Sequence, residues 1–259
     1  MGPRPFVFGT NFKMNQTPEE SVVFYQRLVA AVSVPSGTQL YVVPPVTSLA
    51  AVAEVAAADA ANVWVGAQNM HWAAEGAFTG EVSARMLQAL HVNLVLVGHA
   101  ERRGLFLEQD VDLNKKVAAA IDAGMHVLLC VGETGDERAF GVSVETVCRQ
   151  LKIDLHGLAP EAASKLLVAY EPVWSIGAGG VPATPDDIAP IALVIRATLE
   201  GLFGSHGTAV PILYGGSVNG GNAGTFVTIP EIDGLLVGRA GWTVESYLET
   251  LNAALASRA

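Results

Sequence analysis

The sequence contains only two cysteines in 259 residues, Cys130 and Cys148. They do not form a CxxC pair, and no cluster of histidines accompanies either of them. A disulfide framework or a zinc site built on thiolates needs more cysteines at closer spacing. The sequence therefore indicates neither, and we expect no metal.

Basic residues are also scarce. Lys and Arg number 15 against 25 Asp and Glu, which gives a formal net charge of −10 at pH 7. A protein whose main partner is a nucleic acid or an anionic membrane carries a basic face. The net negative charge argues against both partners. An anionic substrate would need hydrogen-bond donors or cations placed locally at its binding site.

Long apolar segments are missing as well. No run of about 18 apolar residues occurs, which is roughly the length that crosses a bilayer. Residues 1–5 are not followed by the apolar core of a signal peptide. We therefore expect a cytoplasmic protein with no membrane-spanning segment.

Apolar residues are plentiful overall, at 51% of the chain against 15% charged. No linker or break in composition divides the chain, so we expect one domain over residues 1–259. Short β-rich runs alternate with segments of helical period, such as 18–32, 108–123 and 185–203, with Thr17 and Thr184 as expected N-caps. The strand candidates are 6–8, 40–43, 63–65, 94–97, 127–131, 166–169, 210–213 and 234–237.

This alternation predicts a (β/α)8 TIM barrel of the α/β class, because eight βα units in about 250 residues are what that barrel requires. A doubly wound sheet is the alternative, but no GxGxxG follows the first strand. In a TIM barrel the active site lies on the loops that follow the strands. Functional side chains are therefore expected directly after the strand candidates.

Chemically useful residues do follow the strand candidates. Lys13 follows the first, His99 the fourth and Glu171 the sixth, and glycine-containing turns at 214–217 and 238–239 follow the last two. Chance supplies one or two polar loop residues, but this gathering favours catalysis. Glu171 also precedes a proline that cannot continue the strand, and the glycines at 177–180 can form a closing loop. Taken alone, that stretch could equally be a solvated loop acid and an ordinary turn.

These motifs resemble the triosephosphate isomerase family along essentially the whole chain. The matching segments are 11–15, 66–69, 76–81, 98–99 with 101–103, 130–133, 169–174, 214–218 and 233–238. The resemblance implies an aldose-ketose isomerase that interconverts D-glyceraldehyde 3-phosphate and dihydroxyacetone phosphate by proton transfer through an enediol, as in glycolysis and gluconeogenesis. It also implies a homodimer, a small phosphorylated sugar as substrate, and no cofactor.

By this resemblance Glu171 is the general base and His99 the electrophile, in the neutral state known from triosephosphate isomerase itself. Residues 101–103 are expected to open a short helix whose dipole disfavours the charged imidazole. Lys13 would supply positive charge to the developing oxyanion, and Asn11 a neutral hydrogen bond. Without the resemblance, His99 would be interpreted as a core histidine.

The resemblance assigns phosphate binding to the backbone N–H groups at Gly177, Ser217, Gly238 and Arg239. This agrees with the rule that loops after strands seven and eight of the barrel hold phosphate at the start of a short helix.

Four further residues are expected in supporting roles. Glu101 is the expected partner of Lys13, because an ammonium at the end of a buried strand needs an anion. Tyr214 would help to latch the closed lid, and Thr79 lies on a loop that resembles one reaching into a partner subunit. Cys130 is expected to pack near the base and not to act as a nucleophile, because no neighbouring base is evident.

The sequence departs from the triose pattern at four places. They are Ala100 in place of a serine, residues 71–72, a lid over 174–184 that is one residue longer, and Arg239 in place of a glycine together with 241–242. Together they resemble the relatives of erythritol catabolism that interconvert L-erythrulose 1-phosphate and D-erythrulose 4-phosphate. That activity is the alternative to the triose reaction, and drift within a triose enzyme is the competing explanation.

Two other classes receive less support. A non-catalytic phosphate-binding barrel would be expected to lose Glu171, His99 or Lys13, and all three are present. A lyase or aldolase would need a Schiff-base lysine on an interior strand. Lys165 is the only lysine near the sixth strand, and it falls at the wrong end.

Overall fold

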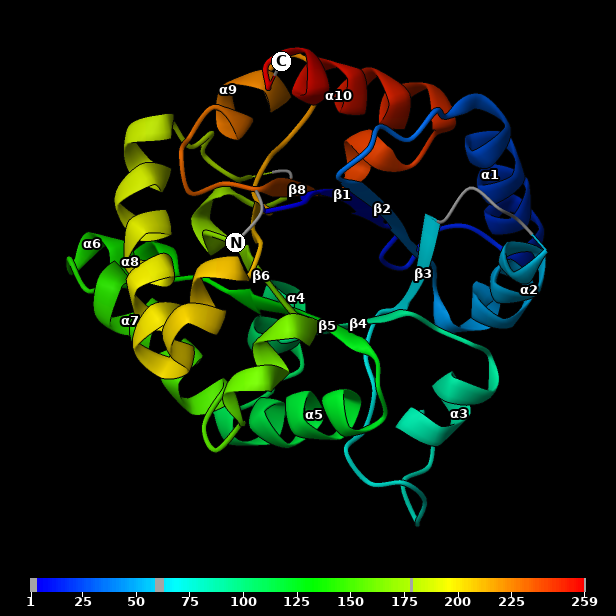
Figure 1. Cartoon of the computed structure of the whole chain (residues 1–259), viewed down its shortest axis with the longest axis horizontal. Coiled ribbons are helices and arrows are strands. Elements are labelled where there is room, and N and C mark those ends of the chain that lie inside the picture. Colours follow the sequence, from blue (N-terminus) through cyan, green and yellow to red (C-terminus); the bar gives the residue numbers. More distant parts are fainter. Residues whose placement is uncertain (1–3, 59–62, 178, 259) are drawn as a thin grey trace.

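The computed structural model describes residues 4–58, 63–177 and 179–258. Within them, eight parallel strands form a closed barrel in chain order, and helices surround it (Figure 1). The strands are β1 Phe6–Asn11, β2 Thr38–Val43, β3 Val63–Ala67, β4 Leu94–Val97, β5 His126–Val131, β6 Leu166–Tyr170, β7 Ile212–Tyr214 and β8 Gly234–Val237. Pairing of β8 with β1 closes the ring. The predicted TIM barrel is confirmed.

The helices lie between consecutive strands and outside the ring (Figure 1). They are α1 Pro18–Ala31, α2 Val46–Ala57, α3 Ala84–Ala89, α4 Ala100–Leu105, α5 Asp110–Asp122, α6 Gly135–Ala139, α7 Ser143–Asp154, α8 Pro185–Phe203, α9 Ala223–Val227 and α10 Val244–Ala256. Thr17 and Thr184 each form a capping box at the start of a helix, as expected.

Several predicted boundaries differ from the structure by one to three residues; the first strand, for example, runs to Asn11 and not to 8. The seventh strand begins at Ile212 and not at 210, because Pro211 has no N–H to give to the ladder; its carbonyl instead accepts from Val168 N at 3.0 Å. The helix expected from 108 begins at Asp110. Glu108 lies before it, where its carboxylate accepts from Arg102 and Lys116.

Side-chain alternation along the strands places the site residues inside the barrel mouth. On β6, Leu167 and Ala169 face the barrel interior, whereas Val168 and Tyr170 pack against the surrounding helices. Because the side-chain period of a strand is two, Glu171 continues the inward row just beyond the strand. The barrel thus directs a carboxylate into its own mouth.

One helical segment of the described residues, Pro185–Ala209, is long and apolar enough to cross a bilayer by length and composition alone. In this structure its apolar face covers the barrel, with Ile188, Ile195 and Leu199 fully buried. Packing against the barrel accounts for its apolar composition, as in the core helices of other globular domains.

Candidate active site

A cavity of about 480 Å³ opens at the carboxyl ends of the strands. Its lining includes nine of the residues singled out from the sequence, namely Asn11, Lys13, His99, Glu101, Glu171, Gly177, Ser217, Gly238 and Arg239. Loops from β1, β4, β6, β7 and β8 contribute them. The residues that the strand-end rule singles out therefore line one cavity.

Glu171 lies at the base of this cavity with its side chain only 2% exposed. Its Oε2 atom accepts a hydrogen bond from the backbone N–H of Ala100 at 2.9 Å, and its Oε1 atom lies 3.4 Å from His99 Nε2. A Cβ atom at Gly215 would come within 2.9 Å of Glu171 Cγ. Glycine at 215 therefore leaves the space that the carboxylate occupies.

His99 is the N-cap of α4, so the short helix expected after it is present. Its Nδ1 atom accepts the backbone N–H of Glu101 at 3.2 Å. A ring nitrogen that accepts a hydrogen bond carries no proton, and the neutral ring then bears its proton on Nε2. The proton-bearing nitrogen is the one nearest the Glu171 carboxylate.

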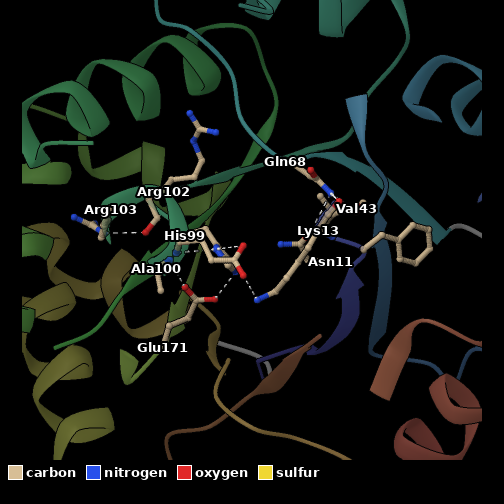
Figure 2. A network of polar contacts seen from close by, with 12 residues as sticks. Asn11, Lys13, Val43, Gln68, His99, Ala100, Arg102, Arg103 and Glu171 are labelled. Atoms are coloured by element: carbon tan, nitrogen blue, oxygen red, sulfur yellow. Dashed lines mark hydrogen bonds and ion pairs between the residues drawn. The ribbon is translucent and has the colours of Figure 1, made fainter. Parts of the chain in front are cut away.

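Lys13 approaches from the opposite side of the cavity (Figure 2). Its ammonium forms an ion pair with Glu101 Oε1 at 2.6 Å, the partner expected from the sequence. Its backbone has a φ of 54°, in the left-handed region, and its N–H donates to Asn11 Oδ1 at 2.8 Å. Lys13, His99 and Glu171 thus converge from three strands.

Two residues that the sequence did not single out for a role hold this lysine turn in place. Gln68 Nε2 donates to Asn11 Oδ1 at 3.1 Å and to the carbonyl of Lys13 at 2.8 Å (Figure 2). Trp242 Nε1 donates to the carbonyl of Asn11 at 3.0 Å. Gln68 lies in a segment that matches the family, and Trp242 lies in one that departs from it. Nothing in the sequence pairs either residue with β1.

Cys130 and Tyr214 support the site from below the cavity. Cys130 is fully buried on the inner face of β5. Burial, and then the Glu171 carboxylate, raise the pKa of its thiol well above the usual range, so it remains a thiol. The hydroxyl of Tyr214 lies 3.2 Å from Ser175 Oγ, at the start of the loop expected to act as a lid.

The lid is anchored at both ends by contacts with its neighbours. Trp174 Nε1 donates to Glu133 Oε1 at 2.7 Å, and Val181 N donates to the carbonyl of Trp174 at 2.9 Å. The guanidinium of Arg138 lies 3.7 Å from the centre of the Trp174 ring and pairs with Asp187 Oδ1 at 2.6 Å. Arg138 therefore contacts both the first residue of the lid and a residue just beyond its end.

The turn after β8 presents backbone amide groups next to the guanidinium of Arg239. Residues Arg239–Gly241 form a 3-10 turn that starts directly after Gly238. Arg239 is exposed, and within the described part of the chain its guanidinium has no ion-pair partner.

The loop between β3 and α3 carries Thr79 and extends away from the barrel (Figure 1). Thr79 is exposed and does not line the cavity of this chain, as far as the described residues show. The same residues contain no group of three or more His, Cys, Asp or Glu side chains that could hold a metal ion.

Comparisons with known proteins agree with this geometry. The sequence model of the family described as triosephosphate isomerase matches residues 5–254. A protein named L-erythrulose-1-phosphate isomerase from Rhizobium etli is 44% identical, with 94% of this chain and 90% of that protein covered.

A protein named triosephosphate isomerase from Carboxydothermus hydrogenoformans is also 44% identical, over 94% of this chain and 96% of that protein. Among solved structures, a triosephosphate isomerase from Bartonella henselae superposes with a TM-score of 0.86 at 32% identity, covering 97% of this chain and 99% of that one.

Proposed function

The chain belongs to the triosephosphate isomerase family, and from that premise we propose that it interconverts D-glyceraldehyde 3-phosphate and dihydroxyacetone phosphate. The observation that carries the proposal is the 3.4 Å approach of Glu171 Oε1 to His99 Nε2 in a cavity that also contains the Lys13 ammonium. A base, a neutral donor and a cation in one cavity are what proton transfer next to a carbonyl requires.

In the proposed reaction, the Glu171 carboxylate removes a carbon-bound proton from the substrate. Nε2–H of His99 donates to the carbonyl oxygen on which negative charge develops. Lys13 adds fixed positive charge, and Asn11 a neutral hydrogen bond, to the same region. Glu171 then returns the proton to the neighbouring carbon, while the hydroxyl proton of the first carbon passes by way of His99 Nε2 to the former carbonyl oxygen. The reaction is therefore acid-base chemistry throughout, and we propose that it uses no cofactor.

The phosphate of the substrate is proposed to bind at the backbone N–H groups of Gly177, Ser217, Gly238 and Arg239. All four residues line the cavity, and three of them follow β7 and β8. Closure of the lid over this phosphate would exclude water, which protects the enediol from eliminating phosphate.

A second candidate is the interconversion of L-erythrulose 1-phosphate and D-erythrulose 4-phosphate, in erythritol catabolism. The relative from Rhizobium etli that carries this name is as similar to the chain as the triose relative. Among the positions that depart from the triose pattern, Arg239 and Trp242 line the cavity, as do Ile176 and Gly177 of the longer lid, so the departures lie where the sugar would bind. A difference of about one carbon in the substrate corresponds to only about 10-fold to 200-fold discrimination.

The test is to measure kcat/KM of the pure protein on dihydroxyacetone phosphate and on L-erythrulose 1-phosphate in parallel. We expect turnover of both, with the higher value for the triose. A higher value for the tetrulose would replace the first candidate by the second. Turnover of neither would reject both and would favour a barrel that only binds phosphate.

We further propose a cytoplasmic homodimer whose subunits each form one catalytic domain over residues 1–259. Met14, next to Lys13, is 96% exposed, and Phe78 is exposed on the projecting loop that carries Thr79. Apolar side chains so placed favour burial against a second subunit. Sedimentation velocity tests this: the expected species has twice the mass of the chain, 2 × 27.0 kDa.

A further inference from the structure

We propose that Trp242 is a positioning residue of this site, which ties the turn after β8 to the turn after β1 and so holds Lys13 in place. The inference rests on the proposed function, because it concerns the same site. Trp242 lines the cavity and is half-buried against the barrel core.

The contacts of Trp242 fall on both sides of Lys13 in the sequence. Its indole N–H donates to the carbonyl of Asn11 at 3.0 Å. Its own carbonyl accepts from Gln16 Nε2 at 2.9 Å. The segment 11–16, with Lys13 inside it, is thus attached at both ends to one residue of the β8 turn.

This segment needs such attachments because its backbone is strained. Lys13 has a φ of 54° and Gln16 a φ of 71°, both in a region that residues other than glycine rarely adopt. Such conformations persist when the surroundings hold them. Gln68 holds the segment from the β3 side, and Trp242 holds it from the β8 side.

Trp242 also belongs to the turn proposed to bind phosphate. The backbone N–H of Trp242 donates to the carbonyl of Arg239 at 3.2 Å, and the backbone N–H of Gly241 donates to the carbonyl of Gly238 at 2.8 Å. A Cβ atom at Gly238 would lie 3.9 Å from Cε of Lys13, so the two turns are adjacent. Trp242 therefore links the turn that carries the cation, through its indole N–H and its carbonyl, to the turn with the proposed anion-binding amides, through its backbone N–H.

The test compares two Trp→Phe changes in the full-length protein. Trp242→Phe keeps an aromatic ring and removes the indole N–H. Trp64→Phe is the matched control, because Trp64 is also half-buried. Its ring stacks on that of His126, with 4.3 Å between the ring centres, and neither residue lines the active-site cavity. Four quantities are measured: the dissociation constant of inorganic phosphate, kcat, KM, and the rate of hydrogen exchange of the amides in 11–16.

We expect Trp242→Phe to weaken phosphate binding about fivefold, to lower kcat about fivefold and to speed amide exchange in 11–16 about fivefold, which is the size of one lost neutral hydrogen bond. Trp64→Phe should change each by less than about twofold, even where it lowers the melting temperature as much. Equal effects of the two changes on phosphate binding and exchange would overturn the inference.

Gln16→Met provides a second variant that does not depend on the tolerance of a tryptophan change. It removes the donor to Trp242 and also an Oε1 atom that is buried without a hydrogen-bond partner among the described residues, so stability should hold. We expect faster exchange in 11–16 and weaker phosphate binding, and unchanged exchange would contradict the inference. Failure of the proposed function would appear as an absence of turnover by the unaltered protein. The amide-exchange measurement needs no substrate, so it tests the role of Trp242 even in that case.

Discussion

The carboxylate of Glu171 accepts a hydrogen bond from the backbone N–H of Ala100 at 2.9 Å. Ala100 is the first residue of α4, whose opening N–H groups have no partner within the helix. The same helix gives its next N–H, from Glu101, to His99 Nδ1. The start of one short helix therefore orients both the proposed base and the proposed electrophile.

Ala100→Ser is expected to lower kcat about fivefold with little change in KM. The added hydroxyl lies next to the Glu171 carboxylate and can donate a second hydrogen bond, worth about 1 kcal/mol, that the base must give up before it acts. Ala100→Gly keeps the N–H and adds no donor, so its kcat should stay close to that of the unaltered protein. Steady-state kinetics of the three proteins decides, and a faster serine variant would contradict this view of the base.

Lys13→Met should reduce kcat/KM by at least about 100-fold, because it removes the fixed positive charge from the cavity while keeping a side chain of similar length. Lys152→Met, an exposed residue of α7, loses the same formal charge far from the site and should leave kcat/KM unchanged. The measurement is kcat/KM on the preferred substrate. A similar loss in both variants would mean that only the net charge of the protein matters.

Deletion of Gly179 is expected to shift the ratio of kcat/KM values toward the triose phosphate, because it shortens the lid by one residue. A Cβ at this position would meet no atom within 4 Å in the part of the chain that the structure describes, so Gly179→Ala is a control that keeps the lid length at little steric cost. Both proteins are assayed on the triose and the tetrulose. An unchanged ratio in the deletion variant would remove lid length from the specificity argument.

His126 predicts a pH dependence of stability. Burial, and secondarily the charge of Lys165, lower the pKa of His126 to about 4. The unfolded chain, where the histidine pKa is about 6.5, binds more protons between those two values. The free energy of unfolding should therefore fall as the pH is lowered through this window.

The variant that tests this is His126→Phe, which keeps a ring against Trp64. Its urea midpoint should fall less between pH 7 and pH 5 than that of the unaltered protein, because one group that must take up a proton on unfolding is gone. Equal losses in the two proteins would show that His126 does not contribute.

Much of the geometry of this site is predictable from the sequence because it follows from two general rules. Alternation along β6 directs Glu171 inward, and parallel strands in a closed ring bring their carboxyl ends together. Thr184 signals the start of α8 through its own capping chemistry. These features depend on nearest neighbours in the chain or on the fold as a whole.

The attachments of Lys13 are not predictable in that way. Gln68 and Trp242 reach the β1 turn from β3 and from beyond β8, and a polar side chain after a strand has no signature that names its partner. The start of β7 was misplaced for a different reason. An apolar run containing Pro211 looks like strand, although proline cannot donate to the ladder.

The most direct test of the account is to incubate the protein and Glu171→Gln with substrate in deuterium oxide and to follow deuterium at the carbon next to the carbonyl. We predict rapid incorporation by the unaltered protein. In the variant, incorporation should fall by at least about 100-fold while inorganic phosphate still binds, since glutamine keeps the shape of the side chain without its basicity. Undiminished incorporation by Glu171→Gln would contradict the assignment of Glu171 as the base and, with it, the proposed mechanism.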